Sequence, residues 1–480
     1  MKRPTHRFLV PFLCGGVFSL AALFLTIGGV TMASVSRYED LALFTSVLNH
    51  IRLNYVEPVD EHELLSSALN GLLRELDPHS AFMDSDAYRE MQVDTRGEFH
   101  GLGIEITKRQ DQAIEVVAPI DGTPAARAGI RSRDRITKIC PTEPPEDWSE
   151  ECRPTKSMTL LEAVKLMRGR KGTKIIIHIY REGFTEPEPF EIVRDVVQMS
   201  SVKGEMLEPG YAYVRVSAFQ ERTEKELGEE LERLHAEAPE GFKGLVLDLR
   251  DNPGGLLDQA VRVSDFWLDE GLIVYTQGRE ETQRQEYLAS AGATQGDYPL
   301  VVLVNEGSAS ASEIVAGALQ DQHRALLLGV ETFGKGSVQT VYPLDGGAGL
   351  RLTTALYYTP AGRSIQEKGI LPDIEVAAAP PEMLADRARP RRVRERDLEG
   401  HFTHEEADPD AAPAEGEGEE GDEAKADDDA DIDPQLERGL EVLKSWSYFE
   451  RLRRGRDDEA VTVQAELVSD ASREAEPGPQ

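Results

Sequence analysis

The order of apolar runs in residues 210–376 constrains the fold more than any other feature of the sequence. Short runs that are apolar at nearly every position, such as 244–249 and 300–304, alternate with longer stretches of helical spacing. A strand that is apolar on both faces is typical of a parallel sheet covered by helices. The segment therefore predicts a layered α/β core. The expected strands are 212–216, 244–249, 272–275, 300–304, 325–328, 338–342 and 350–357, and the expected helices are 223–236, 256–266 and 312–320.

Residues 95–195 have a different pattern and predict a separate, smaller β domain. Short strands are expected at 113–117, 136–139 and 174–180, with helical turns at 122–133 and 159–166. Two motifs stand out: Gly101-Leu102-Gly103-Ile104, and the segment from Pro124 to Ile130. Together they resemble a PDZ domain. The resemblance implies that the backbone at Gly101, Leu102, Gly103 and Ile104 binds the terminal carboxylate of a peptide that adds to the domain as a strand.

The N-terminus predicts export. Residues 8–36 carry no charged side chain and lie between Arg7 and Arg37. As a helix they would extend about 43 Å, enough to cross roughly 30 Å of hydrocarbon. A signal-anchor and a cleaved signal peptide both fit residues 1–36, and either leaves the basic flank in the cytoplasm. We expect the remaining chain at the periplasmic face of the inner membrane, anchored or released. Residues 37–94 predict an N-terminal helical segment.

Cys140 and Cys152 lie in the exported part of the sequence, on either side of a proline-rich insertion. Two interpretations stay open at this point: a disulfide, which the compartment permits, and two unpaired small apolar side chains. The histidines form no recognised metal-binding motif, so we expect neither a metal nor a cofactor.

The charge of the chain argues against nucleic-acid binding. It carries 87 acidic and 53 basic residues, a net charge of −34. A protein that binds phosphate backbones needs a basic face instead. Fifteen of the acids fall in residues 405–433, so the total says little about the substrate. We expect 379–433 to be an arginine-rich and then acidic disordered linker, and 434–480 to form a helix and a tail.

Three motifs follow or precede strands of the predicted core and carry chemistry-bearing side chains. Ser310 lies where the strand 300–304 gives way to a helix, a place where helix N–H groups favour negative charge. Ser310 and Glu313 also have capping-box spacing, so Ser310 could simply cap that helix. Lys335 stands between two glycines just before a strand, and Asp248–Gly255 ends a buried strand with two glycine N–H groups.

Taken together with Leu76–Ser80 and Thr353–Gln366, these motifs resemble the carboxyl-terminal processing peptidases, serine proteases of the S41 group. The resemblance implies a crotonase/ClpP-like peptidase core at 196–378 with an inserted PDZ domain. It implies Ser310 as the nucleophile, Lys335 as its base and Gln339 as the support of that lysine. The oxyanion N–H groups would belong to Ala311 and to either Gly254 or Gly255.

The implied partners are proteins or peptides with a free C-terminus, captured by the PDZ domain. An adaptor or a second copy of the chain is a further expected partner, and the membrane is contacted through the N-terminal segment. A PDZ scaffold that binds without cutting, or that cuts only conditionally, is the alternative function. Asp77-Pro78-His79-Ser80 is interpreted as a turn after a helix, with no chemistry assigned.

Overall fold

The computed structural model describes residues 38–109, 112–142, 148, 151–292, 295–378, 393–402, 433–446 and 448. Its chain divides into two compact units after Leu72. The predicted anchor at 1–36 lies outside the described residues. Within the residues that are described, no helix combines the length and the apolar character needed to cross a membrane.

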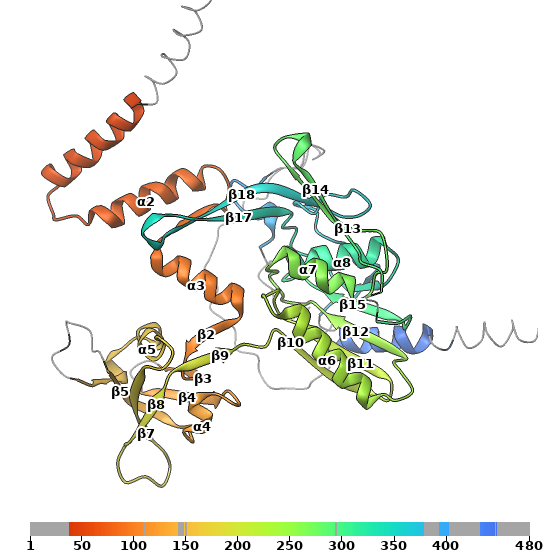
Figure 1. The fold of residues 1–480 in the computed structure, drawn as a ribbon, viewed down its shortest axis with the longest axis horizontal. Coiled ribbons are helices and arrows are strands. Elements are labelled where there is room, and N and C mark those ends of the chain that lie inside the picture. Colours follow the sequence, from red (N-terminus) through yellow and green to blue (C-terminus); the bar gives the residue numbers. More distant parts are fainter. Residues whose placement is uncertain are drawn as a thin grey trace, which may run out of the picture. The chain divides into compact units, whose positions relative to one another are not determined.

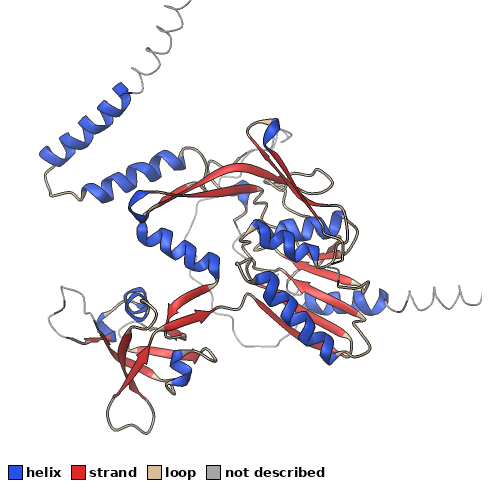
Figure 2. Cartoon of the chain, in the orientation of Figure 1, coloured by secondary structure: helices blue, strands red, loops and turns tan. Residues whose placement is uncertain are grey.

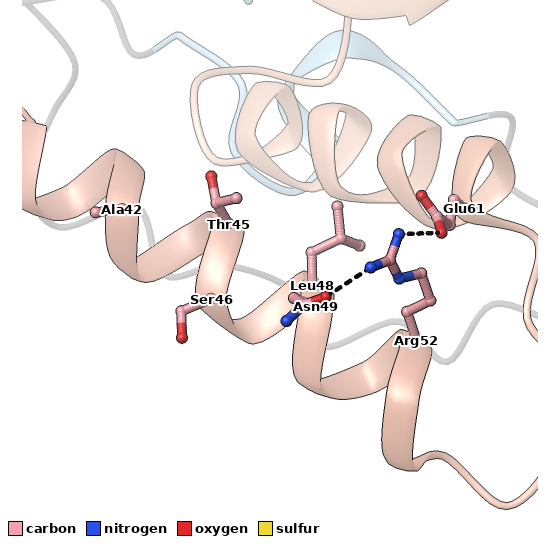
Figure 3. A pocket seen from close by; sticks show the side chains of 7 residues that line it. All are labelled: Ala42, Thr45, Ser46, Leu48, Asn49, Arg52 and Glu61. Atoms are coloured by element: carbon pink, nitrogen blue, oxygen red, sulfur yellow. Dashed lines mark hydrogen bonds and ion pairs between the residues drawn. The ribbon is translucent and has the colours of Figure 1, made fainter.

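The first unit consists of a helix at 38–54 and most of helix α2, Glu61–Arg74. Figure 3 shows a shallow hollow between the two, where Arg52 donates to Asn49 over 2.8 Å and to Glu61 over 3.4 Å. Many apolar side chains of these helices are exposed. They are Tyr38, Leu41, Leu43, Phe44, Val47, Leu53, Leu65 and Leu72.

The predicted core is a six-stranded sheet in the order β10-β11-β12-β15-β16-β19. Four of its strands, β10, β11, β12 and β15, are labelled in Figure 1. Its strands are β10 Val202–Glu208, β11 Tyr211–Val216, β12 Gly244–Asp248, β15 Leu300–Val304, β16 Leu326–Gly329 and β19 Ile374–Glu375. β10 runs antiparallel to β11, and the other pairs are parallel. The predicted strands in this sheet therefore lie where the apolar runs place them, within one or two residues at each end.

Both faces of this sheet are buried, which explains the continuous apolar runs. Leu245 and Leu247 point to one face, into a cluster with side chains of three helices. These are α6 Thr223–Glu237, α7 Leu257–Asp265 and α8 Ala311–Asp321. Val246 points to the opposite face, where Leu443 of the helix at 434–446 packs beside it. We call 434–446 the C-terminal helix; strands and helices of this region are distinguished by colour in Figure 2.

A second, antiparallel sheet has the order β1-β18-β13-β14, with β17 also paired to β18. Its strands are β1 Ala81–Met83, β13 Leu272–Gly278, β14 Arg284–Leu288, β17 Ser337–Pro343 and β18 Gly349–Tyr358; short 3-10 turns lie at Glu281–Gln283 and Asp345–Gly347. β1 adds to this sheet directly after the Asp77–Ser80 turn, with Ala81 opposite Arg351. Helix α3, Ser85–Arg96, follows β1 and is capped at its N-terminus by the side chain of Asp84.

Residues 98–198 form the predicted small β domain, with its sheet in the order β3-β4-β5-β7-β8. The elements are β2 Glu98–Gly101, β3 Ile104–Thr107, β4 Ile114–Pro119, α4 Pro124–Arg127, β5 Arg135–Pro141, β6 Arg153–Pro154, a 3-10 turn at Thr155–Ser157, α5 Leu160–Met167, β7 Lys174–Tyr180, β8 Glu188–Val193 and β9 Asp195–Gln198. The core of this domain includes Ile136, Ile139, Ile175, Ile177 and Ile179. Cys140 and Cys152 form a disulfide, which decides between the two interpretations of the sequence.

The expected disordered linker at 379–433 is too broad a prediction. Residues 393–402 are ordered and include a 3-10 turn at Glu395–Asp397. Their arginines and acids find partners far away in the sequence, which local composition cannot reveal. The remaining residues of the predicted linker, apart from Asp433, lie outside the described residues.

Candidate active site

Three adjacent parallel strands bring the three motifs to one edge of the core sheet. The order β12-β15-β16 places Asp248, Val304 and Gly329 at the carboxyl ends of neighbouring strands. Loops that leave these ends meet at the same edge, as is usual for sites in α/β folds. The motifs at 248–255, 305–310 and 330–336 are therefore gathered by topology. Phe333 donates its N–H to the Ser308 carbonyl over 3.0 Å.

Ser310 lies at the start of α8 in a strained backbone conformation. Its φ of 53° and ψ of −111° are unusual for a residue with a side chain. Such strain costs about 1–3 kcal/mol and tends to occur at functional sites. Ser310 is largely buried, and its side chain lies near the hydroxyl of Tyr357. Burial also raises the pKa of Tyr357, so this hydroxyl stays protonated at neutral pH.

The loop of β12 lies directly against Ser310. A Cβ atom at Gly254 would stand 2.8 Å from the Ser310 Cβ, so only glycine permits this approach. The Gly254 N–H donates to Asn252 Oδ1 over 2.9 Å and is therefore already engaged. The N–H groups of Gly255 and Ala311, by contrast, donate to no acceptor in the part of the chain that the structure describes. Of the two glycines considered, Gly255 has the N–H that is free to bind a ligand.

Lys335 precedes β17 and is partly buried. Burial lowers the pKa of its amine, and the nearby charge of Arg351 lowers it further. Glu395, Glu313 and Asp77 act in the opposite direction. Among the described residues the amine makes no hydrogen bond. A lysine with a depressed pKa can be neutral near physiological pH and can then accept a proton.

Glu313 is a site residue that the sequence analysis treated only as part of a helix cap. Its side chain is fully buried. One carboxylate oxygen, Oε2, accepts the N–H of Ser310 over 2.7 Å and that of Lys335 over 3.0 Å. The other, Oε1, accepts the N–H of Gly334 over 2.7 Å and the hydroxyl of Thr332 over 2.5 Å. One carboxylate therefore joins the backbone of the predicted nucleophile to the loop of its predicted base.

Burial of the Glu313 carboxyl raises its pKa to about 7, even though all four hydrogen bonds favour the ionised form. The capping-box spacing of Ser310 and Glu313 was the signal in the sequence that pointed to this contact. What the spacing could not show is that the same carboxylate also reaches the lysine loop.

Gln339 is not placed on the Lys335 amine. Its side-chain amide donates to Ser337 Oγ over 2.9 Å and to Thr353 Oγ1 over 3.4 Å. Thr353 Oγ1 in turn donates to Asp77 Oδ1 over 3.1 Å. The structure therefore links Gln339 to the Asp77 turn, and its predicted support of the lysine stays a prediction.

The residues Asp77–Ser80 form the turn expected from the sequence, and this turn also makes contacts that the sequence did not predict. Asp77 accepts the backbone N–H groups of His79 and Ser80, which is the expected turn. The same turn also donates outward, since His79 Nε2 lies 2.8 Å from a carboxylate oxygen of Glu395. With Asp77 acting on the pKa of Lys335, this turn forms one wall of the site.

The loop at Gly101–Ile104 has the features expected of a carboxylate-binding loop. Gly103 has a φ of +74°, and a Cβ there would stand 2.3 Å from the side chain of Thr123. The N–H groups of Leu102 and Gly103 have no acceptor within the described residues. Ile104 begins β3, which lies at the edge of its sheet, so one side of this strand has no partner strand in that sheet.

Groups of side chains that lie close enough together to hold a metal ion are scarce in the described residues. The one group of three that lies close enough is Cys140, Cys152 and His178. The disulfide engages both thiols, so this group does not offer three free ligands. His323 lies beyond the far end of α8 from Ser310, which does not favour a serine–histidine arrangement.

Comparison with known proteins finds family matches for three parts of the chain. Residues 210–376 match the family model "Peptidase family S41", 90–179 match "PDZ domain", and 28–87 match "Activating protease CtpB N-terminal domain". The carboxy-terminal-processing protease of Bartonella bacilliformis is 44% identical over 78% of this chain and 83% of its own length. The carboxy-terminal processing protease CtpA of Bacillus subtilis is 34% identical over 78% of each chain.

Among solved structures, the photosystem II D1 C-terminal processing protease matches with 31% identity and a TM-score of 0.40, over 69% of this chain and 86% of that one. Membership is decided by the sequence matches, which cover more than three quarters of this chain and of each relative at 44% and 34% identity. The chain belongs to the carboxyl-terminal processing peptidases of family S41, hydrolases of peptide bonds that here carry a PDZ domain.

Proposed function

We propose that this peptidase is a serine endopeptidase with a Ser–Lys dyad that cleaves proteins near or from their free C-terminus. The observation that carries the proposal is the shared carboxylate of Glu313, which ties the backbone of Ser310 to that of Lys335. The depressed pKa of Lys335 and the strained backbone of Ser310 are consistent with a base and a nucleophile.

In this mechanism neutral Lys335 takes the hydroxyl proton of Ser310 while Oγ attacks the scissile carbonyl carbon. The carbonyl oxygen becomes negative and accepts the N–H groups of Ala311 and Gly255. The Lys335 ammonium then protonates the leaving amine, and the C–N bond breaks to give an acyl-enzyme. Lys335, neutral again, activates the water that hydrolyses the ester and restores Ser310. Gln339 would hold the Lys335 amine, after leaving Ser337.

The PDZ domain supplies specificity for chain ends. The N–H groups of Leu102 and Gly103 would bind the substrate carboxylate, and the free edge of β3 would pair with its last residues. An amidated peptide lacks the carboxylate. Cleavage of an amidated peptide at the same rate as its free-acid twin would refute capture of the chain end.

We place the protein at the periplasmic face of the inner membrane, held or first delivered there by residues 1–36. The exposed apolar side chains of 38–54 and α2 support association of this part with an adaptor or a second copy. The location is tested by fusing a reporter after Tyr448, expressing the fusion and fractionating the cells.

The decisive experiment incubates the full chain with an unstructured protein and with a free-acid tail peptide. Ser310→Ala and Lys335→Ala should each lower cleavage by several orders of magnitude. Equal cleavage by all three proteins would refute the dyad.

A conditionally active scaffold is the second candidate, because among the described residues the Lys335 amine makes no hydrogen bond to Ser310, whose side chain lies near the hydroxyl of Tyr357. Tight binding of the tail peptide without cleavage, by the parent protein, would favour that function. Cleavage that begins only when the tail peptide is present would identify a resting enzyme instead.

A further inference from the structure

Residues 393–402 pack against the active site although they lie beyond the part of the chain that matches the peptidase family model, 210–376. We call this ordered segment the clasp. Its Glu395 is fully buried, which is unusual for an acid unless it is paired. This burial suggests that the segment is a fitted part of the site, and its contacts show what it touches.

Glu395 binds both walls of the site. Its carboxylate oxygens lie 2.9 and 2.8 Å from His79 Nε2, in the turn that follows α2. The Gln366 amide donates to Glu395 Oε1 over 2.9 Å. Partners on two sides, together with the charge of Lys335, keep the pKa of Glu395 below its usual value, so it is ionised at neutral pH.

The clasp also holds the loop that carries Lys335. The Glu395 N–H donates to the Phe333 carbonyl over 3.2 Å. Gln366, which donates to Glu395, accepts the N–H of Gly336 through its Oε1 over 3.0 Å. Glu395 is thus connected to the residues on both sides of Lys335, directly at 333 and through Gln366 at 336.

Further contacts fasten both ends of the clasp to the same body. At one end Arg394 and Arg396 form ion pairs with Glu331. At the other, His401 lies 2.7 Å from Glu367, and the Gln366 amide donates to the Phe402 carbonyl over 3.2 Å. These contacts join both ends of the clasp to residues that flank Lys335 or the Gln366 segment.

We propose that the clasp completes the active site, and that Glu395 is a positioning residue that fixes the Lys335 loop and sets the charge around the lysine amine. This inference rests on the proposed role of Lys335 as base. Lys335 itself faces four charged groups: Arg351 from β18, Glu313 from α8, Asp77 from the turn, and Glu395 from the clasp.

Glu395→Gln tests the proposal in the full chain, because glutamine keeps the shape and one acceptor but removes the charge. The matched control is Glu399→Gln, the same change at an exposed position of the clasp. We expect Glu395→Gln to lower kcat at the pH plateau by about tenfold or more while KM changes less than about twofold. The ascending limb of kcat should move to lower pH, because the negative charge of Glu395 raises the pKa of Lys335 and its removal lets the amine lose its proton at lower pH. Glu399→Gln should behave like the parent.

A plateau and an ascending limb that both match the parent would overturn the proposal, as would a uniform loss of activity with an unshifted limb. If Glu395→Gln does not fold, Arg394→Ala with Arg396→Ala decides, because it loosens the clasp and leaves Glu395 intact. This double variant should lower kcat without moving the limb, and an unchanged kcat would refute the clasp. Failure of the dyad is recognised separately, as cleavage by the parent that survives Ser310→Ala.

Discussion

Replacing Glu313 with glutamine probes the one carboxylate that joins the nucleophile to the lysine loop. The side chain is fully buried and accepts four hydrogen bonds, two at each oxygen. Glutamine has nearly the same size but offers one acceptor oxygen and one donor amide. Two of the four donors would then face an N–H₂ group, so the alignment of Ser310 with Lys335 should be disturbed. We expect kcat to fall by at least about 100-fold.

The effect on stability depends on pH in a direction that the structure fixes. Burial raises the folded pKa of Glu313 from 4.5 to about 7. Between these values the folded protein binds more protons than the unfolded chain, so stability falls as pH rises. One pKa unit corresponds to about 1.4 kcal/mol, and integration from pH 5 to pH 8 gives a loss of about 2.5 kcal/mol from this group. Below pH 4.5 the contribution is fully present. Glutamine at position 313 cannot titrate and removes this loss.

The assay is urea unfolding of the full chain at pH 5 and pH 8, followed through the fluorescence of the buried Trp267 in the core. Between pH 5 and pH 8 the parent should lose about 2.5 kcal/mol of unfolding free energy that Glu313→Gln keeps. The stability of the variant relative to the parent should therefore rise by that amount at pH 8. Glu306→Gln removes a charge from the same segment and serves as the control. A difference that is constant within about 0.5 kcal/mol between the two pH values would refute the reasoning, because it would mean that the four donors hold the pKa near its ordinary value.

Three further predictions concern parts of the fold away from the nucleophile. Reduction of the Cys140–Cys152 disulfide should destabilise the PDZ domain by about 3 kcal/mol, as measured by calorimetry. A variant with serine at both positions should not respond to the reductant, and a response by this variant would contradict the prediction. Asp433→Asn should speed hydrogen exchange in the C-terminal helix, since Arg250 lowers the pKa of Asp433; the ion pair acts above pH 3.8 and is lost as pH falls below it. Leu443→Ala should cost about 2–5 kcal/mol in urea unfolding because this side chain is fully buried, and a cost below about 1 kcal/mol would exclude tight packing there.

The core could be predicted from sequence because its central strands are apolar at nearly every position. Residues 244–249 and 300–304 lie within one residue of β12 and β15. Once these strands are parallel neighbours, their polar carboxyl-terminal loops must meet, so Ser310 and the glycines at 254 and 255 follow from topology. The strands β8 Glu188–Val193 and β10 Val202–Glu208 were not predicted. Both lie at the edge of a sheet and are partly exposed, so charged residues interrupt their apolar residues.

The remaining parts of the site depend on contacts between residues far apart in the sequence. His79 and Glu395 are in contact although more than three hundred residues separate them in the sequence, and no motif around either residue predicts the other as its partner. The hydrogen bond of Gln339 to Thr353 could not be predicted either, because it follows from the pairing of β17 with β18. Local spacing predicted that Glu313 caps α8, but only the tertiary structure shows it joined to Lys335.

The two fastened ends around the acidic region have a consequence for chain cleavage. Phe402 is held through Gln366, and Asp433 is held by Arg250 over 2.7 Å, so residues 403–432 connect two anchored points of one body. A single nick between them would divide the polypeptide without releasing either piece, since Leu443 and its helix stay packed on the sheet. Nicked protein should run as two bands on a denaturing gel and as one particle in native gel filtration. Self-cleavage of this enzyme in the acidic region would then be detected by the masses of the two fragments under denaturing conditions, and not by a change in the size of the native particle.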